Sequence, residues 1–286
     1  MTAEQDPFED LAENWRPDSL TVVRRVDEAP LVGFADLLDV PTAFPVGAEV
    51  PLAWHWFTFT PRLRQAELAD DGHPASGALM PEFPHRKRMM AGGSLQQDEA
   101  FRVGENYSRR SEVESVTVKS GRSGRMLFVT TRHTYADTGG RQAAVERENA
   151  VYRQQAPGQP RQLSAQGPST EPWHRDRGRD GELDTRTDPR LLFRFSALTN
   201  NAHRIHYDAP YAREVEGYPG LVVHGPLLAL LMLEQVRRSG RPATSFEYKL
   251  LAPAFCGDAV RAVRDGTDMA IGTVGSAAAS ASGRAD

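Results

Sequence analysis

The longest continuous apolar stretch of the chain lies between residues 220 and 240. From Leu227 onward, apolar residues cover almost every side of a helix for two turns, which predicts a buried helix. Gly225 and Pro226 come directly before it, and proline suits the first helical turn, where its missing N–H needs no partner. Two arginines and a Ser-Gly step near residue 240 indicate its end. The sequence therefore predicts a buried helix whose free backbone N–H groups begin at Gly225.

Elsewhere the apolar pattern favours strands. Regular alternation predicts an antiparallel meander of three strands joined by glycine turns, over 105–120, 125–136 and 141–153. Further strands are predicted over 20–24, 52–59, 191–197, 244–251, 259–264 and 269–274, and short helices over 33–39 and 62–70. The residues 71–74, Asp-Gly-His-Pro, indicate a turn, and the chain from there to Gly93 is interpreted as irregular. The fold class predicted is α+β.

Composition divides the chain into regions. Residues 154–188 are rich in Gln, Pro, Gly, Arg and Asp, and they hold too little aliphatic surface to fold, so they predict a linker. It separates an N-terminal unit, 51–153, from a C-terminal unit, 189–274, that holds the buried helix. Residues 1–50 are interpreted as an arm with the first elements. The low-complexity end, 275–286, is predicted to be a disordered tail.

Composition also excludes several classes of protein. The chain has 286 residues and a net charge of -4, with no basic stripe of the kind that binds nucleic acid. No apolar run approaches membrane-spanning length, and the acidic N-terminus lacks a signal core. The single cysteine, Cys256, rules out an internal disulfide framework and is interpreted as a packing residue. A cytoplasmic protein without nucleic-acid or membrane partners is predicted.

A polar loop before the buried helix concentrates Asn201, His203 and His206. The run NAHRIHYD, with Val223-His224-Gly225 downstream, resembles the motif of the MaoC-like hydratases and dehydratases, D-x-N-P-x-H followed by H-G at a helix start. Several short segments resemble those of one double-hotdog subgroup within this family. They are SALT, YPGLVVHGP, LLAPAFCGD, DGHP and RMMAGG. This subgroup contains fungal-type mitochondrial 3-hydroxyacyl-thioester dehydratases and bacterial mesaconyl-C4-CoA and itaconyl-CoA hydratases. The resemblance covers about residues 51–263.

This resemblance implies a double hotdog: two antiparallel sheets, each wrapped around a central helix, with a degenerate N-terminal copy. It implies a hydro-lyase that reversibly hydrates an enoyl-CoA or dehydrates its 3-hydroxyacyl form, with mesaconyl-C4-CoA or itaconyl-CoA as the leading substrates. Neither a metal nor another cofactor is expected, since an H-x-x-H pair alone is a weak metal signal. The alternatives are a 3-hydroxyacyl-ACP dehydratase, an acyl-thioester-binding protein without turnover, and a thioesterase, because a fold does not fix its chemistry. A homodimer remains open.

The resemblance also assigns the site. His206 matches the catalytic base of the family, against a purely structural role, and Gly225 would donate its N–H to the thioester oxygen, against a role in packing alone. Asn201 stands where the wider family has Asp; an amide can hold a water but cannot transfer its proton. His203, His224 and Asp208 are interpreted as possible catalytic or supporting groups, with helix capping as the simpler role of Asp208.

Substrate contacts are assigned to four further residues. These are Arg86, Arg88, Tyr207 and Val223. The two arginines flank Lys87, and guanidinium groups suit CoA phosphates or a substrate carboxylate. A solvated basic loop is the alternative for this segment.

Overall fold

The computed structural model describes residues 7–121, 124–155, 182–240, 243–276 and 278–286. The α-helices are α1 (Pro7–Asn14), α2 (Glu28–Leu37), α3 (Pro189–Thr199), α4 (Ala209–Glu214) and α5 (Gly225–Arg238), and the 3-10 helices are η1 (Trp54–Phe57), η2 (Gln65–Glu67) and η3 (Arg204–His206). The strands are β1 (Leu20–Arg25), β2 (Arg86–Gln97), β3 (Asn106–Gly121), β4 (Gly124–Asp137), β5 (Gln142–Gln154), β6 (Leu183–Arg186), β7 (Ser245–Leu250), β8 (Ala259–Asp265), β9 (Asp268–Thr273) and β10 (Ala281–Ala285). No helix among these residues is long and apolar enough to cross a membrane.

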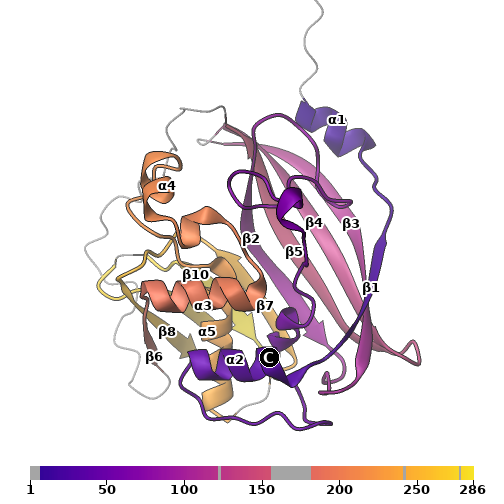
Figure 1. Cartoon of the computed structure of the whole chain (residues 1–286), viewed down its shortest axis with the longest axis vertical. Helices are drawn as coiled ribbons and strands as arrows, with labels where there is room; N and C mark the ends of the chain where they lie inside the picture. The colour runs from indigo at the N-terminus through magenta and orange to yellow at the C-terminus, as the bar shows by residue number, and fades with distance from the viewer. Residues whose placement is uncertain (1–6, 122–123, 156–181, 241–242, 277) are drawn as a thin grey trace, which may run out of the picture.

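All strands belong to one antiparallel sheet, in the order β1-β3-β4-β5-β2-β7-β10-β9-β8-β6. Counted outward from its centre, the N-terminal half runs β2-β5-β4-β3-β1 and the C-terminal half runs β7-β10-β9-β8-β6, so the same topology occurs twice (Figure 1). The double hotdog is confirmed. It differs from the expected form in one respect: pairing of β2 with β7 joins the two sheets into one.

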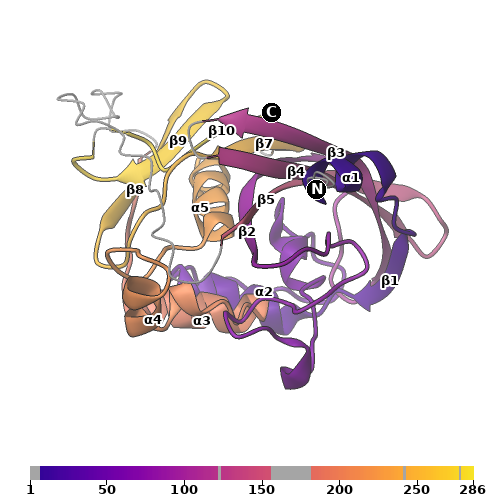
Figure 2. The same cartoon turned by 90° about the horizontal axis from the view of Figure 1, so that it is seen from above.

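Helix α5 is the central element of the C-terminal half. It contacts β8, β9 and β10 on one side, and α2 and α3 cover its other side (Figure 2). All ten residues from Leu227 to Val236 are buried, as the apolar pattern predicts. The one buried carboxylate among them, Glu234, forms ion pairs with Arg237 and Arg238 at 2.6 and 2.8 Å. The predicted start at Gly225 is confirmed.

The N-terminal half has no comparable helix. Between α2 and β2, in the position that α5 takes in the C-terminal half, the described chain forms only the short 3-10 helices η1 and η2. The predicted strand over 52–59 is therefore wrong. Ala53 has a left-handed backbone with φ of 67°, which breaks an extended chain at this point. The rings of Trp54 and Phe57 both pack on Phe34 of α2, with centroid distances of 4.8 and 4.7 Å. Residues three apart point to opposite faces of a strand, so these two contacts require a helical turn.

The predicted strand over 191–197 is also wrong, because this segment is α3. Its buried residues Leu192, Phe195 and Ser196 follow helical spacing. Asp188 caps the helix by accepting the N–H of Leu191 at 2.9 Å. The Asp-Pro step at 188–189 is a helix-start signal that the cluster of large apolar residues obscured.

The chain end, predicted to be a disordered tail, forms β10 instead. This strand lies between β7 and β9, and Ala281 and Ala285 are buried in the core. A Cβ added at Gly283 would lie 2.8 Å from the carbonyl oxygen of Glu247. The small residues that resemble low complexity are therefore the ones that fit between two neighbouring strands.

Of the other predicted elements, some are confirmed and some differ in position or type. The meander is confirmed as β3, β4 and β5, and β1, β7, β8 and β9 lie where strands were predicted. The helix predicted over 33–39 lies earlier, as α2; the one over 62–70 shortens to η2; and β2 occupies part of the segment interpreted as irregular. Most of the predicted linker, 156–181, lies outside the described residues, and its end contributes β6.

Strand β10 gives a direct test of this sheet. Replacing the fully buried Ala281 with Glu places an unpaired charge between two core strands, and we expect the free energy of unfolding to fall by about 3 kcal/mol or more. Arg284→Gln is the matched control, since it removes only an exposed ion pair worth under about 1 kcal/mol. Urea denaturation measures both variants. Equal stability of the two would contradict the pairing of β10.

Candidate active site

Four histidine rings lie in a row across the boundary between the two halves. The ring centroids are 3.8 Å apart from His73 to His203, 5.5 Å from His203 to His206, and 3.6 Å from His206 to His224. They come from three segments: the 71–74 turn, the loop after α3, and the residue before α5. Half of the eight histidines of the chain therefore meet at one place.

The ring of His206 is held in one tautomer. Its Nδ1 lies 2.8 Å from the carbonyl oxygen of Val222, and a carbonyl can only accept, so Nδ1 carries the hydrogen. The neutral ring then has its lone pair on Nε2, which has no hydrogen-bond partner among the described residues. This is the state that a general base needs.

His224 places this ring against the start of α5. It is the N-cap residue of α5, it is fully buried, and it stacks on His206 with 17° between the ring planes. Its Nε2 lies 2.9 Å from the hydroxyl of Ser196 on α3. The pattern did not identify Ser196 as a site residue, because α3 was interpreted as a strand. The structure thus brings His206 and Gly225 together, as the resemblance implies.

The backbone N–H of Gly225 has no acceptor among the described residues. It stands at the positive end of a buried helix, where an anionic oxygen is favoured. The alternative role in packing also has support, since an added Cβ would lie 2.3 Å from Cδ1 of Leu250. The two roles are compatible, because the absence of a side chain at Gly225 both allows the close contact with Leu250 and leaves the backbone N–H at the helix start uncovered.

Burial determines the protonation of the row. Loss of hydration lowers the pKa of His206 to about 4 and that of His203 to about 2, and it holds the pKa of His224 well below its usual value. Neighbouring rings add to the effect, because a charge on one disfavours a charge on the next. These three imidazoles are therefore neutral near pH 7.

Asn201 organises the loop that carries two of these rings. Its side-chain oxygen accepts the backbone N–H of His203 at 3.0 Å, and its own N–H donates to the carbonyl of Ser196 at 2.9 Å. The side-chain NH₂ has no partner within the described part of the chain. An amide donor is thus available beside the histidine row.

The N-terminal half supplies the other wall of the site. Gly72 has φ of 87°, and a Cβ there would lie 1.7 Å from the carbonyl oxygen of Ala202, so only glycine allows this contact. The N–H of Arg204 donates to the carbonyl of Asp71 at 2.9 Å. The residues Asp-Gly-His-Pro predict the turn at 71–74, but no local pattern shows that it docks on a loop so far away in the sequence.

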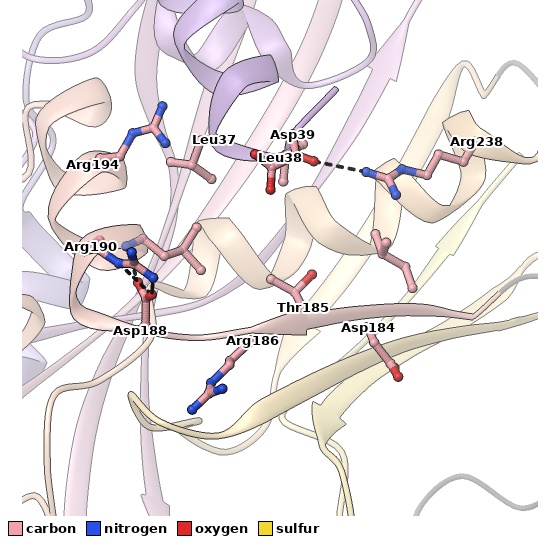
Figure 3. Close-up of a pocket in the computed structure, with 12 residues that line it drawn as sticks. Leu37, Leu38, Asp39, Asp184, Thr185, Arg186, Asp188, Arg190, Arg194 and Arg238 are labelled. Atoms are coloured by element: carbon pink, nitrogen blue, oxygen red, sulfur yellow. Dashed lines mark hydrogen bonds and ion pairs between the residues drawn. The ribbon is translucent and has the colours of Figure 1, made fainter. Parts of the chain in front are cut away.

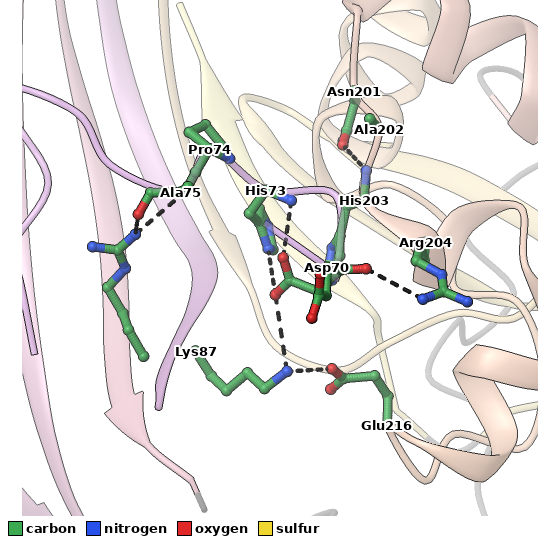
Figure 4. Close-up of polar contacts among 12 residues, drawn as sticks. Asp70, His73, Pro74, Ala75, Lys87, Asn201, Ala202, His203, Arg204 and Glu216 are labelled. Carbon is green, nitrogen blue, oxygen red and sulfur yellow. Dashed lines mark hydrogen bonds and ion pairs between the residues drawn. The ribbon is translucent and has the colours of Figure 1, made fainter. Parts of the chain in front are cut away.

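The turn brings a charged network with it (Figure 4). One oxygen of Asp71 accepts the backbone N–H of His73 at 2.9 Å, and the other lies 3.2 Å from its Nδ1. Lys87 lies 3.8 Å from Asp71 and 2.6 Å from Glu216. Burial alone would raise the pKa of Asp71, but the hydrogen bonds and charge of His73, with a further contribution from His203, lower it below its ordinary value.

Asp71, His73 and His203 are also the one group in the described chain with metal-ligand character, with ligand atoms within 4.8 Å of one another. Two features weigh against a metal there. The rings of His73 and His203 pack against each other, with centroids 3.8 Å apart and 36° between their planes, and Nδ1 of His73 already lies 3.2 Å from the Asp71 carboxylate. Lys87 already places a positive charge beside Asp71. The group is a hydrogen-bonded cluster, and we assign no ion to it.

The remaining assigned residues have structural partners. Asp208 caps α4 by accepting the N–H of Tyr211 at 3.1 Å, and it pairs with Arg204 at 2.7 Å, so the capping role describes its contacts. The hydroxyl of Tyr207 donates to the carbonyl of Ala202 at 3.0 Å. The N–H of the buried Val223 donates to a carbonyl at 2.9 Å.

The two arginines assigned to substrate are held in the same way. Arg86 donates to three loop carbonyls, those of Pro81, Pro74 and Ala75. Arg88 forms an ion pair with Glu148. The contacts of both side chains fix the loop and the sheet, and none of them reaches the histidine row.

A cavity of about 550 Å³ lies elsewhere, among the ends of α2 and α5, the start of α3 and β6 (Figure 3). Arginines and aspartates both line it, and Arg190 is held by Asp188. It shares no lining residue with the histidine row, so it is separate from the site described above.

The chain is a hydro-lyase with the double-hotdog fold. The model of the hydroxyacyl-thioester dehydratase type 2 family matches residues 53–256, which is most of the chain. The chain belongs to this family. The family description names a hydroxyacyl thioester, and one relative is named for a CoA thioester.

Two curated relatives support this membership, and two solved structures share the fold. Mesaconyl-C(4)-CoA hydratase of Chloroflexus aurantiacus is 43% identical over 233 residues, 79% of each chain, and the mitochondrial hydroxyacyl-thioester dehydratase type 2 of Schizosaccharomyces pombe is 46% identical over 77 residues, 26% of each chain. HtdX of Mycobacterium tuberculosis shares the fold, with a TM-score of 0.64, 14% identity and coverage of 94% of this chain and 99% of its own. A second protein of that organism, described as a double hotdog, has a TM-score of 0.56 at 17% identity and covers 97% and 96%.

The lowered pKa values predict how stability depends on pH. The pKa of His206 is 6.5 in the unfolded chain and about 4 in the folded chain. Between these two pH values, unfolding is therefore accompanied by the uptake of a proton at His206. Stability is therefore lost as the pH falls through this window, by up to about 1.4 kcal/mol per pH unit for His206. His206→Gln should reduce the loss between pH 6 and 5 by about 1 kcal/mol, measured by urea denaturation.

Thr199→Val is the control for this experiment. It removes the hydrogen bond from the Thr199 hydroxyl to the carbonyl of Phe195 without removing a titratable group. It should lower stability about equally at both pH values. An unchanged pH dependence in His206→Gln would show that this ring protonates alike in the folded and unfolded chains.

Proposed function

We propose that the protein reversibly adds water to the double bond of an enoyl-CoA, with mesaconyl-C4-CoA or itaconyl-CoA as the leading substrates. Identity of 43% to a mesaconyl-C(4)-CoA hydratase over 79% of the chain supports a short dicarboxylyl-CoA. The observation that carries the chemistry is the hydrogen bond from Nδ1 of His206 to Val222, because it leaves Nε2 as a base.

In the proposed mechanism, Nε2 of His206 takes a proton from water as the oxygen bonds to the β-carbon. The electron pair of the double bond moves toward the thioester carbonyl, and the N–H of Gly225 donates to the oxygen that gains charge. Water exclusion strengthens that hydrogen bond, since the start of α5 is buried. Protonation of the α-carbon completes the addition.

Asn201 is proposed to hold the attacking water through its side-chain NH₂. The oxygen of its amide is already occupied by the N–H of His203, which fixes the direction of the group. An amide neither takes nor gives a proton here. The proton transfers therefore fall to imidazoles.

A panel of thioesters tests the reaction class. Purified protein should bleach the enoyl-thioester absorbance of mesaconyl- or itaconyl-CoA faster than that of crotonyl-CoA, without release of free thiol. Faster turnover of an ACP-linked substrate would support the carrier-protein alternative. Thiol release would indicate a thioesterase. A rise in melting temperature with CoA esters, without turnover, would indicate a binding protein and overturn the proposal.

The base assignment has its own test. His206→Gln should lower kcat by about 10²-fold or more, because general base catalysis contributes on this scale. Asn201→Ala should cost less if the amide only positions water. Thr130→Ala, in the N-terminal sheet, is the control: it removes a single hydrogen bond, to Asn149, outside the proposed site. Near-normal turnover in His206→Gln would refute the assignment.

A further inference from the structure

We propose that His73, oriented by Asp71, is a second acid–base residue, and that the N-terminal half contributes it to the site. This inference rests on the proposed function. It answers a chemical need: hydration moves two protons, one off the water and one onto the α-carbon, and Asn201 can transfer neither.

His73 differs from the other three rings in its partner. His206 bonds a carbonyl and His224 a hydroxyl, whereas Nδ1 of His73 lies 3.2 Å from a carboxylate. The same carboxylate accepts the backbone N–H of His73 at 2.9 Å, so two contacts fix its position. A hydrogen-bonded carboxylate stabilises a protonated imidazole, and a carbonyl or hydroxyl does so far less.

The dyad also has a defined direction. Because the Asp71 carboxylate is ionised, it accepts, and Nδ1 of His73 must donate. Nε2 is then the exchanging position, and its ring packs on His203 and continues the row toward His206. The side chain of His73 is 20% exposed, so its proton exchanges with solvent. The geometry provides an acid, His73, at the exposed end of the row and a base, His206, two rings further along.

The surrounding charges hold the dyad in place. Lys87 faces Asp71, but its ammonium is paired with Glu216 at 2.6 Å, which balances its charge. The hydroxyl of Tyr211 lies 3.4 Å from the same glutamate. The groups that face His73 are thus Asp71, the neutral ring of His203 and this paired lysine.

The step balances as follows. His206 takes one proton from water, the water oxygen bonds to the β-carbon, and the π bond breaks. The resulting enolate takes a proton from Nε2 of the protonated His73, which forms the α C–H bond. One proton must then leave His206 and one must return to His73, and solvent exchange at the exposed ring supplies the second. Dehydration runs the same steps in reverse.

The test measures kcat against pH for the wild-type full chain, His73→Gln and Asp71→Asn, in the hydration direction. Since hydration needs protonated His73, wild-type kcat should fall on the alkaline side. His73→Gln should lower kcat by about 10²-fold and abolish this alkaline limb. Asp71→Asn should move the limb to lower pH, because the imidazolium loses its carboxylate.

His85→Asn is the matched control. His85 is an exposed histidine in the same N-terminal segment, and Asn tolerates its left-handed backbone, with φ of 54°. Replacing His85 should change neither the value of kcat nor the fall of kcat on the alkaline side. Should His73→Gln fail to fold, as judged by circular dichroism, the shift in Asp71→Asn decides the matter.

Two results would overturn the inference. One is a His73→Gln variant with wild-type kcat; the other is a lowered kcat that keeps the wild-type alkaline limb, which would make the dyad purely structural. Failure of the proposed function is distinguishable, because wild-type protein would then hydrate none of the esters.

Discussion

Pairing of β2 with β7 is the constraint on which the site depends. Among the strands that the structure describes, it is the one pairing that joins the two halves, and it runs from Gly92 to Gln96 on β2. The approach is very close: a Cβ at Gly92 would lie 2.2 Å from the carbonyl of Tyr248. Glycine at this position lets the two edge strands meet, and the meeting brings the 71–74 turn of one half onto the histidine loop of the other.

Two copies of one topology have diverged in this chain. The C-terminal copy keeps a long central helix, and its start forms the bare N–H end of the site. In the N-terminal copy η1 has only four residues, and the following segment folds into turns, one of which docks on the site. Loss of a regular helix in one copy thus coincides with a new wall for the other.

Burial of imidazoles gives the site its chemical character. Three of the four rings lose hydration and stay neutral, so their nitrogen lone pairs and hydrogens are fixed by neutral partners such as Val222 and Ser196. His73, at the exposed end, keeps a carboxylate. A row of similar side chains therefore contains rings with different hydrogen-bond partners, and environment alone makes the difference.

The sequence by itself determined the elements whose local signals agree. The all-round apolar run after Gly225-Pro226 gave α5, the alternation gave β3 to β5, and the loop with Asn201 and His206 was identified together with its family. It failed where a residue's role is set by distant neighbours. The small residues at 281–285 have the composition of a disordered tail, but they form a strand between β7 and β9. The aromatic segment 52–59 has the composition of a strand, but its contacts with Phe34 hold it in a turn. Only the tertiary structure decided that Asp71 and His73 lie beside His203, because hydrophobic periodicity reports which face of an element is buried and carries no information on which distant loop it meets.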